Sequence, residues 1–210
     1  MKKNTIIKNA IVATTTIILL TGGVYSMQVN AKDTMEIAQY NNDLSNFTFT
    51  ADSSIRGKGV ISVEAIKEYV ANTTVDGVKE KSEFIGFEGT IHENAVKNGI
   101  DPAFFAVMLN FESANGRGAY VRKLNNPLSI RENATDMRPI NYPSLEVGIE
   151  SAAVHIKTWF DKYYIDTFQD LVDYMYDSFD EAEKKEYLDH YLKVANELVE
   201  IEKEVRKNKQ

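Results

Sequence analysis

The spacing of apolar residues predicts a mostly helical chain with one interruption. Over most of the sequence, hydrophobic side chains stand three or four positions apart, which places them on one face of a helix. Ser62 can cap the first helix by accepting hydrogen bonds from its free N–H groups, and Gly99 can end the second. The residues that these two helices are expected to bury are Ile66, Tyr69, Val70, Phe87, Ile91 and Ala95.

The third expected helix has the clearest start. Asp101 can accept hydrogen bonds from N–H groups of the first turn, and Pro102 stands at the first helical position, where a missing N–H costs nothing. The next position on its apolar stripe is Glu112, so a carboxylate falls on the buried side of the last turn, just before Gly116 and Gly118 end the helix. The stripe itself consists of Phe104, Phe105, Met108 and Leu109.

The position of Glu112 predicts a raised pKa, because burial disfavours the charged form of a carboxyl. A raised pKa is what a general acid needs near neutral pH. A partly solvated glutamate near a frayed helix end is the alternative that the helical pattern leaves open.

The helical spacing disappears between Ala119 and Pro143. This stretch holds an asparagine pair and closely spaced charges of both signs, so we expect a loop or a short hairpin lobe. Ser144 then caps a long helix, and two further apolar stripes precede a charged tail at 202–210 that is expected to fray. The three stripes consist of Ile149, Ala152, Ala153, Ile156, Phe160, Tyr163 and Tyr164; of Phe168, Leu171, Val172, Met175, Tyr176 and Phe179; and of Tyr187, Leu188, Tyr191, Leu192, Ala195, Leu198 and Val199.

Composition narrows the class of protein. The 210 residues suit one domain with flanking helices, and the lack of cysteine excludes disulfides and thiolate chemistry. A net charge of −7 without a basic patch argues against nucleic-acid binding. His92, His155 and His190 are scattered without ligand spacing, so we expect no metal and no cofactor. Trp159 falls within an apolar helix and is expected to pack in the core.

Residues 1–31 have the pattern of an export segment. Lysines precede an apolar run, and Val29-Asn30-Ala31 is a candidate cleavage site. A membrane anchor formed by residues 6–29 is the alternative, because this run approaches the length of a bilayer span.

Three segments are expected after the export segment. Residues 32–56 are polar and are interpreted as a linker. A compact domain is expected at 57–165, and the C-terminal helices at 166–210 would complete or extend it.

FESANGRG, which contains Glu112, and the later LNNPLSI resemble the Glu-Ser…Gly…Asn-Asn pattern of bacterial glucosaminidase domains. These are lysozyme-like peptidoglycan hydrolases, similar to mannosyl-glycoprotein endo-β-N-acetylglucosaminidases. The similarity extends from about residue 61 to about residue 164 and includes the segment 142–149. It implies a mainly α, lysozyme-like helical domain with a small irregular or hairpin lobe over a cleft. The sequence departs from the family at Leu128 and Ser129, where an aromatic residue and a glycine are usual.

The resemblance also implies functional residues. Glu112 would be the catalytic acid. Asparagine amides can both donate to and accept from sugar hydroxyl and N-acetyl groups, although a turn is an alternative explanation for the asparagine pair. The expected substrate-binding residues are Ser113, Asn125, Asn126 and Tyr142.

Most glycosidases use a second carboxylate, and three acids are candidates for it. Glu132 and Asp136 also suit a solvated loop in which they pair with Arg131 and Arg138. Glu146 also suits the first turn of a helix, where the helix dipole favours an acid. A single acid suffices if the acetamido group of the substrate is the nucleophile. It also suffices in a lytic transglycosylase, which uses the 6-hydroxyl of the sugar.

The expected protein is therefore an exported glycosidase that cleaves the β-1,4 linkages of peptidoglycan glycan strands. It would act outside the cell, in the wall or on the outer face of the membrane. A lytic transglycosylase with the same acid remains open. A non-catalytic scaffold or wall-binding module, with envelope protein partners at the C-terminal helices, also remains open.

Overall fold

A computed structural model describes residues 44–73, 81–132 and 138–209. The chain divides into two units, Met1–Asn46 and Phe47–Gln210, and everything below concerns the second. The expected export or anchor segment lies outside the described residues. No helix within the described residues is long and apolar enough to cross a bilayer.

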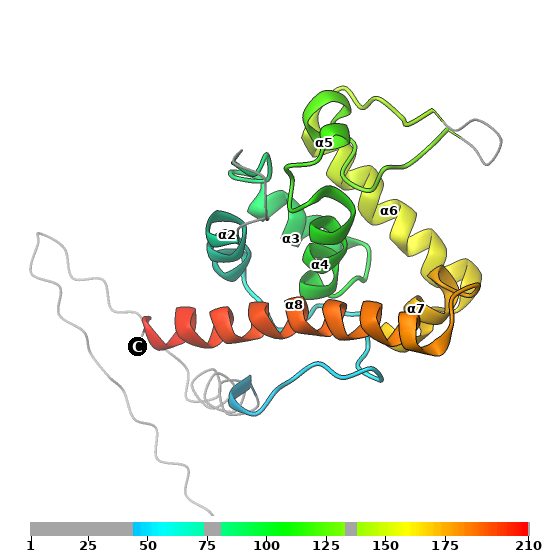
Figure 1. Ribbon diagram of the computed structural model, residues 1–210. Coiled ribbons are helices and arrows are strands. Elements are labelled where there is room, and N and C mark those ends of the chain that lie inside the picture. The colour runs from blue at the N-terminus through cyan, green and yellow to red at the C-terminus, as the bar shows by residue number, and fades with distance from the viewer. Residues whose placement is uncertain (1–43, 74–80, 133–137, 210) are drawn as a thin grey trace, which may run out of the picture. The chain divides into compact units, whose positions relative to one another are not determined.

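The described part of the second unit is mainly helical, as the apolar spacing predicts (Figure 1). Helix α2 packs on α3 and α8, α3 also packs on α4 and α6, and α4 and α7 both pack on α8. The helices are α2 (Val63–Asn72), α3 (Glu88–Lys97), α4 (Pro102–Ser113), α5 (Ala119–Leu124), α6 (Leu145–Tyr163), α7 (Phe168–Met175) and α8 (Glu181–Lys207).

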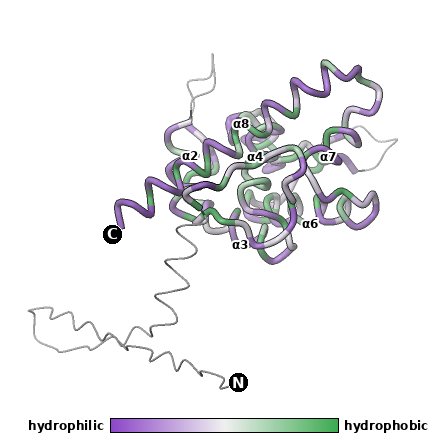
Figure 2. Tube along the Cα trace, turned by 90° about the horizontal axis from the view of Figure 1, so that it is seen from below, coloured by the Kyte–Doolittle hydropathy of each residue, from purple (hydrophilic) through white to green (hydrophobic). Residues whose placement is uncertain are grey.

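Helix α4 lies at the centre of these helices. Every residue from Pro102 to Leu109 is buried, and Figure 2 shows hydrophobic colouring gathered around this helix. The single buried face expected from the sequence is therefore too narrow, because a helix that is apolar all round is enclosed all round. The ring of Phe104 lies 5.8 Å from that of Phe160 and 5.6 Å from that of Phe168, which joins α4 to α6 and α7.

The three predicted capping residues stand at the starts of their helices. Ser62, Asp101 and Ser144 accept hydrogen bonds from first-turn N–H groups of α2, α4 and α6, over 2.8 to 3.3 Å. These bonds satisfy N–H groups that have no partner within the helix. The starts of these three helices are therefore where the sequence predicts them.

Residues 47–56, expected to lie in a linker, pack on the domain. Phe49 is buried, its N–H donates to Asn196 Oδ1 at 2.7 Å, and its carbonyl accepts from Asn196 Nδ2 at 3.1 Å. Ile55 is also buried, and its carbonyl accepts from the Asp101 N–H at 2.9 Å. The domain thus begins before residue 57, because hydrogen bonds to the backbone of this segment hold it against α8 and the start of α4. The polar composition of the segment does not predict these bonds.

The charged tail is helical, and the expected fraying is wrong for it. Helix α8 continues to Lys207, and Glu202 is only 2% exposed. The Glu202 carboxylate accepts from the Ser62 N–H at 2.7 Å, from the Ser62 hydroxyl at 2.6 Å, and from Arg206 Nε at 2.6 Å. This buried, fully paired charge fixes the end of α8 to the start of α2.

The interrupted stretch contains a helix that its apolar spacing does not predict. Helix α5 has six residues and buries only Val121, so it is too short to show a period. It leads into residues 125–142, which we call the 125–142 loop. Its described residues, 125–132 and 138–142, include an isolated antiparallel bridge between Arg131 and Pro139, and the expected hairpin lobe stays a prediction. Tyr163 and Tyr164 are also exposed, because α6 ends there, and they do not extend its buried stripe.

Candidate active site

Helix α4 carries Glu112 in its last turn and ends one residue later. Ala114, the next residue, has a left-handed backbone with φ of 50°, and Gly116 has φ of 77°. The Ser113 hydroxyl donates to the Leu109 carbonyl and accepts from the Gly116 N–H at 2.9 Å. The hydroxyl of Ser113, expected to bind substrate, is therefore buried and engaged in ending the helix.

The Glu112 side chain is half-buried, and this burial raises its pKa, as the sequence predicts. Within the described residues, no hydrogen bond or ion pair joins its carboxyl to another side chain. Two tyrosines lie close enough to Glu112 for its charge to affect their pKa values. Burial raises the pKa of both Tyr176 and Tyr191, and the charge of Glu112 raises both further. The acid thus stands in an apolar niche that favours its protonated form.

Glu112 lines a pocket of about 210 Å³ between the end of α4, α5 and the start of the 125–142 loop. A partner-free carboxyl with a raised pKa, next to an open pocket, suits a proton donor. The other residues that line this pocket are Ser113, Gly118, Ala119, Tyr120, Val121, Asn126 and Ser129.

The asparagine pair holds the 125–142 loop in shape. Asn126 is fully buried; its Nδ2 donates to the carbonyls of Ile130 at 2.7 Å and Ile140 at 3.0 Å, and its Oδ1 accepts from the Ile130 N–H at 2.9 Å. Asn125 Nδ2 donates to the Tyr142 carbonyl at 2.9 Å. The amide donors of both residues, expected to contact substrate, are thus used inside the loop, where they fix the wall of the pocket.

The backbone of the loop also packs closely against α6 at Gly148. A Cβ atom at Gly148 would lie only 1.8 Å from the Asn125 carbonyl oxygen. Only a glycine leaves room for this packing, because no real side chain atom tolerates such an approach. Gly148 therefore sets the position of the loop against the first turns of α6.

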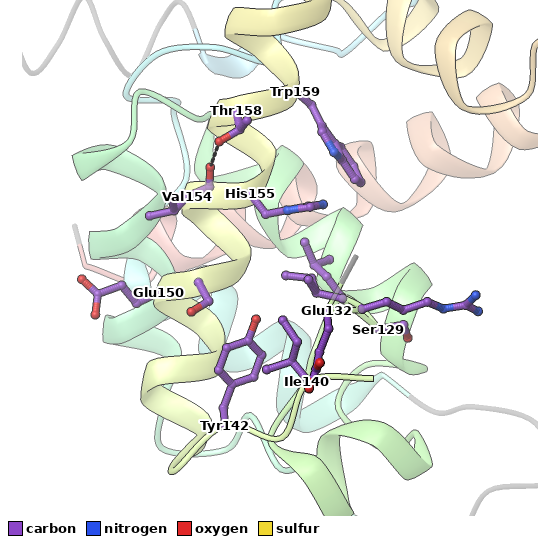
Figure 3. A pocket seen from close by; sticks show the side chains of 13 residues that line it. Ser129, Glu132, Ile140, Tyr142, Glu150, Val154, His155, Thr158 and Trp159 are labelled. Carbon is purple, nitrogen blue, oxygen red and sulfur yellow. Dashed lines mark hydrogen bonds between the residues drawn. The ribbon is translucent and has the colours of Figure 1, made fainter. Parts of the chain in front are cut away.

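A larger groove of about 1020 Å³ lies between the 125–142 loop and α6, and it shares Ser129 with the pocket of Glu112 (Figure 3). Figure 3 shows His155 and Trp159 extending from α6 and Tyr142 rising from the end of the loop. Tyr142 therefore lines this groove and not the pocket of Glu112. The groove offers aromatic rings and hydroxyl groups together.

Trp159 lines the groove, so its expected place in the core is wrong. Its ring meets that of His155 edge-on at 4.8 Å. Burial lowers the pKa of His155, which keeps this imidazole neutral at pH 7. The spacing of apolar residues in α6 does not show whether Trp159 faces the core or the groove, because apolar side chains occur on both of these faces of the helix.

None of the described second-carboxylate candidates shares the pocket of Glu112. Glu132 is exposed, lines the larger groove, and lies 3.7 Å from Arg138, the partner expected from the sequence. Glu146 is exposed in the first turn of α6 and lines neither cavity. Asp136 lies outside the described residues.

An aromatic cluster beside Glu112 is the feature that sequence reasoning missed. The rings of Tyr176 and Tyr187 stack at 4.0 Å, and the hydroxyls of Tyr176 and Tyr191 lie 3.1 Å apart. Phe111, which precedes the acid, lies 4.3 Å from the ring of Tyr191. Their helical spacing predicts burial, but only the packing of α8 on α4 and of α7 on α8 brings these rings to the acid.

Comparison with known protein families, with characterised proteins and with solved structures finds no match to this chain. Across the described residues, no group of histidine, aspartate and glutamate side chains is arranged to hold a metal ion.

Proposed function

We propose that this protein is an exported peptidoglycan glycosidase of the N-acetylglucosaminidase type, with Glu112 as its general acid. The observation that carries the proposal is the setting of this carboxyl. It is desolvated, its pKa is raised, and it has no partner within the described residues. It also lines a pocket that shares Ser129 with a much larger groove.

The arrangement of the motif residues supports the proposal. Glu112, Ser113 and Asn126 line one pocket, although they come from two separate parts of the glucosaminidase-like pattern. Tyr142, from a third part, lines the adjoining groove. A lysozyme-like domain, with the 125–142 loop as the lobe over a cleft, accounts for this convergence.

The groove has the chemistry of a site for a sugar strand. Sugar rings present apolar faces that stack on aromatic side chains and hydroxyl edges that need polar partners. Trp159 and Tyr142 provide the aromatic surfaces, and Ser129 and Ser151 provide hydroxyl groups. A glycan that lies along the groove would reach Glu112 past Ser129.

In the proposed reaction, the Glu112 carboxyl donates its proton to the oxygen that links two sugars. The bond from C1 to that oxygen breaks, and its electron pair stays on the leaving oxygen. A water molecule or the 6-hydroxyl then forms a bond to C1, directly or after attack by the acetamido oxygen, and its proton returns to Glu112.

A lytic transglycosylase is the second candidate, because no other carboxylate in the described residues lines the pocket of Glu112. That reaction needs one acid and no activated water. The two reactions leave different ends: hydrolysis leaves a reducing sugar, whereas transglycosylation leaves a 1,6-anhydro sugar.

The test is mass spectrometry of the products from purified peptidoglycan. We expect wild-type protein to release reducing N-acetylglucosamine ends, and Glu112→Gln to release none. Glu93→Gln, at an exposed position of α3 away from both cavities, should retain activity. Anhydro ends would assign the reaction to the transglycosylase. Unchanged products from Glu112→Gln would reject the role of this acid, and binding without products would favour the non-catalytic wall module.

A further inference from the structure

A second small cavity lies beside the aromatic cluster, and Glu112 does not line it. Its volume is about 230 Å³. Its walls come from α4, from the turn between α7 and α8, and from one face of α8. The lining residues are Phe111, Phe179, Glu183, Glu186, Tyr187 and His190.

Three aromatic rings form its apolar walls at inclined angles. The ring of Tyr187 lies 6.4 Å from that of Phe111, with 52° between their planes, and 5.7 Å from that of Phe179, with 60° between them. Tyr176 stacks on Tyr187 at 4.0 Å and supports it. Aromatic rings attract a cation that lies against one of their electron-rich faces.

Two carboxylates stand at the rim of the same cavity. Glu183 and Glu186 are three positions apart on α8, and they share a face of the helix with Tyr187. Glu183 uses Oε2 to accept the Asp180 N–H at 3.1 Å. Glu186 has no ion pair with any described residue, and no described lysine or arginine lines the cavity. The two glutamates therefore bring negative charge to the cavity, and its lining also includes the imidazole of His190.

We propose that this cavity binds an organic ammonium group, either a primary amine or a quaternary ammonium. Such a group combines a positive charge with an apolar carbon shell, which matches carboxylates at the rim and aromatic rings in the walls. A bare metal ion fits less well, because ring faces offer no ligand oxygen. The site lies outside the proposed catalytic pocket, so its ligand can be tested without turnover.

The test is a titration of the full chain followed by amide chemical shifts, at constant ionic strength. The probes are choline, butylammonium, and 3,3-dimethylbutan-1-ol, the uncharged analogue of choline. We expect saturable shifts around Phe111 and the first turns of α8 with an ammonium probe, and binding of the neutral analogue roughly five-fold weaker or more. Binding by choline alone or by butylammonium alone identifies the type of ammonium, and either result supports the site.

Two variants test whether binding depends on the charge of the cavity or only on its shape. Glu186→Gln keeps the size of the side chain and should weaken ammonium binding roughly three- to ten-fold. Glu200→Gln, on the same helix but paired with Lys203 and outside the cavity, should leave binding unchanged. Equal binding of choline and its neutral analogue, or shifts that Glu186→Gln does not reduce, would overturn the proposal. Either result would leave the glycosidase proposal standing, since Glu112 is not involved.

Discussion

A carboxyl that is held in an apolar niche lowers the stability of the fold whenever it ionises. Burial raises the pKa of Glu112, so the folded state binds its proton more tightly than the unfolded chain does. The contribution of this group to stability is therefore complete at low pH and is lost as pH rises through the folded pKa. A residue kept in such a position despite this loss fits a functional role better than a structural one.

Replacement of this acid by a neutral isostere should therefore stabilise the protein. We expect Glu112→Gln to unfold at a higher temperature than wild type at pH 8, and at the same temperature at a pH low enough to protonate the glutamate. Thermal unfolding at both pH values measures the difference. Glu93→Gln, an exposed control, should show no such pH-dependent gap. A Glu112→Gln protein less stable at pH 8 would contradict the burial argument.

Asp101 shows the same effect at a structural site. It caps α4, but burial raises its pKa to about 6 from an ordinary 3.8. Its contribution to stability is thus complete below about pH 4 and lost as pH rises through 6, and the shift corresponds to roughly 3 kcal/mol at most. Asp101→Asn keeps a cap oxygen without the charge. We expect denaturant unfolding of this variant to depend less on pH between 4 and 7 than that of wild type. An unchanged pH dependence would place the titrating group elsewhere.

The packing of the 125–142 loop on α6 leaves less room at Gly148 than at any other described glycine. An added Cβ would lie 1.8 Å from the Asn125 carbonyl oxygen, so the loop or the helix must shift. We expect Gly148→Ala to lower the free energy of unfolding by about 2–4 kcal/mol. Gly89 in α3 has nothing within 4 Å of its Cβ position, so Gly89→Ala is the matched control. That control should raise stability by about 0.5–1 kcal/mol through helix propensity alone.

The same contact sets the wall of the candidate site. Asn125 carries the carbonyl that meets Gly148, and its side chain holds the backbone of Tyr142. If Gly148→Ala lost no stability in denaturant unfolding, the loop would have freedom to move away, and its role as a fixed wall would be wrong.

At the scale of the whole molecule, the sequence predicted elements better than their arrangement. The caps at Ser62, Asp101 and Ser144 and the apolar periods of the long helices are local signals, and they located those helices. Helix α5 was missed because six residues are too few to show a period. The burial of Glu202 was missed because its hydrogen-bond partner, Ser62, lies 140 residues away in the sequence.

In the candidate site, too, the sequence predicts some residues and leaves the roles of others open. Glu112 could be selected from its place in a helix and from its neighbours in the sequence. The roles of Asn125 and Asn126 could not, because a turn and a sugar contact use the same amide groups. The carbonyls that these amides contact are set by how the two described parts of the loop, 125–132 and 138–142, lie against each other.

The limits of the folding unit give the last prediction. The domain expected at 57–165 lacks both the 47–56 segment and α7 and α8. Those parts supply Phe168, which contacts the central helix, and Tyr191, which is fully buried against Phe111. Loss of these contacts removes large apolar areas from the core around α4, at about 25 cal/mol per Å². We therefore expect residues 57–165 alone to show collapsed amide dispersion and no cooperative thermal transition, whereas residues 47–210 should retain both. A cooperative transition in the shorter fragment would show that the C-terminal helices extend the domain and do not complete it.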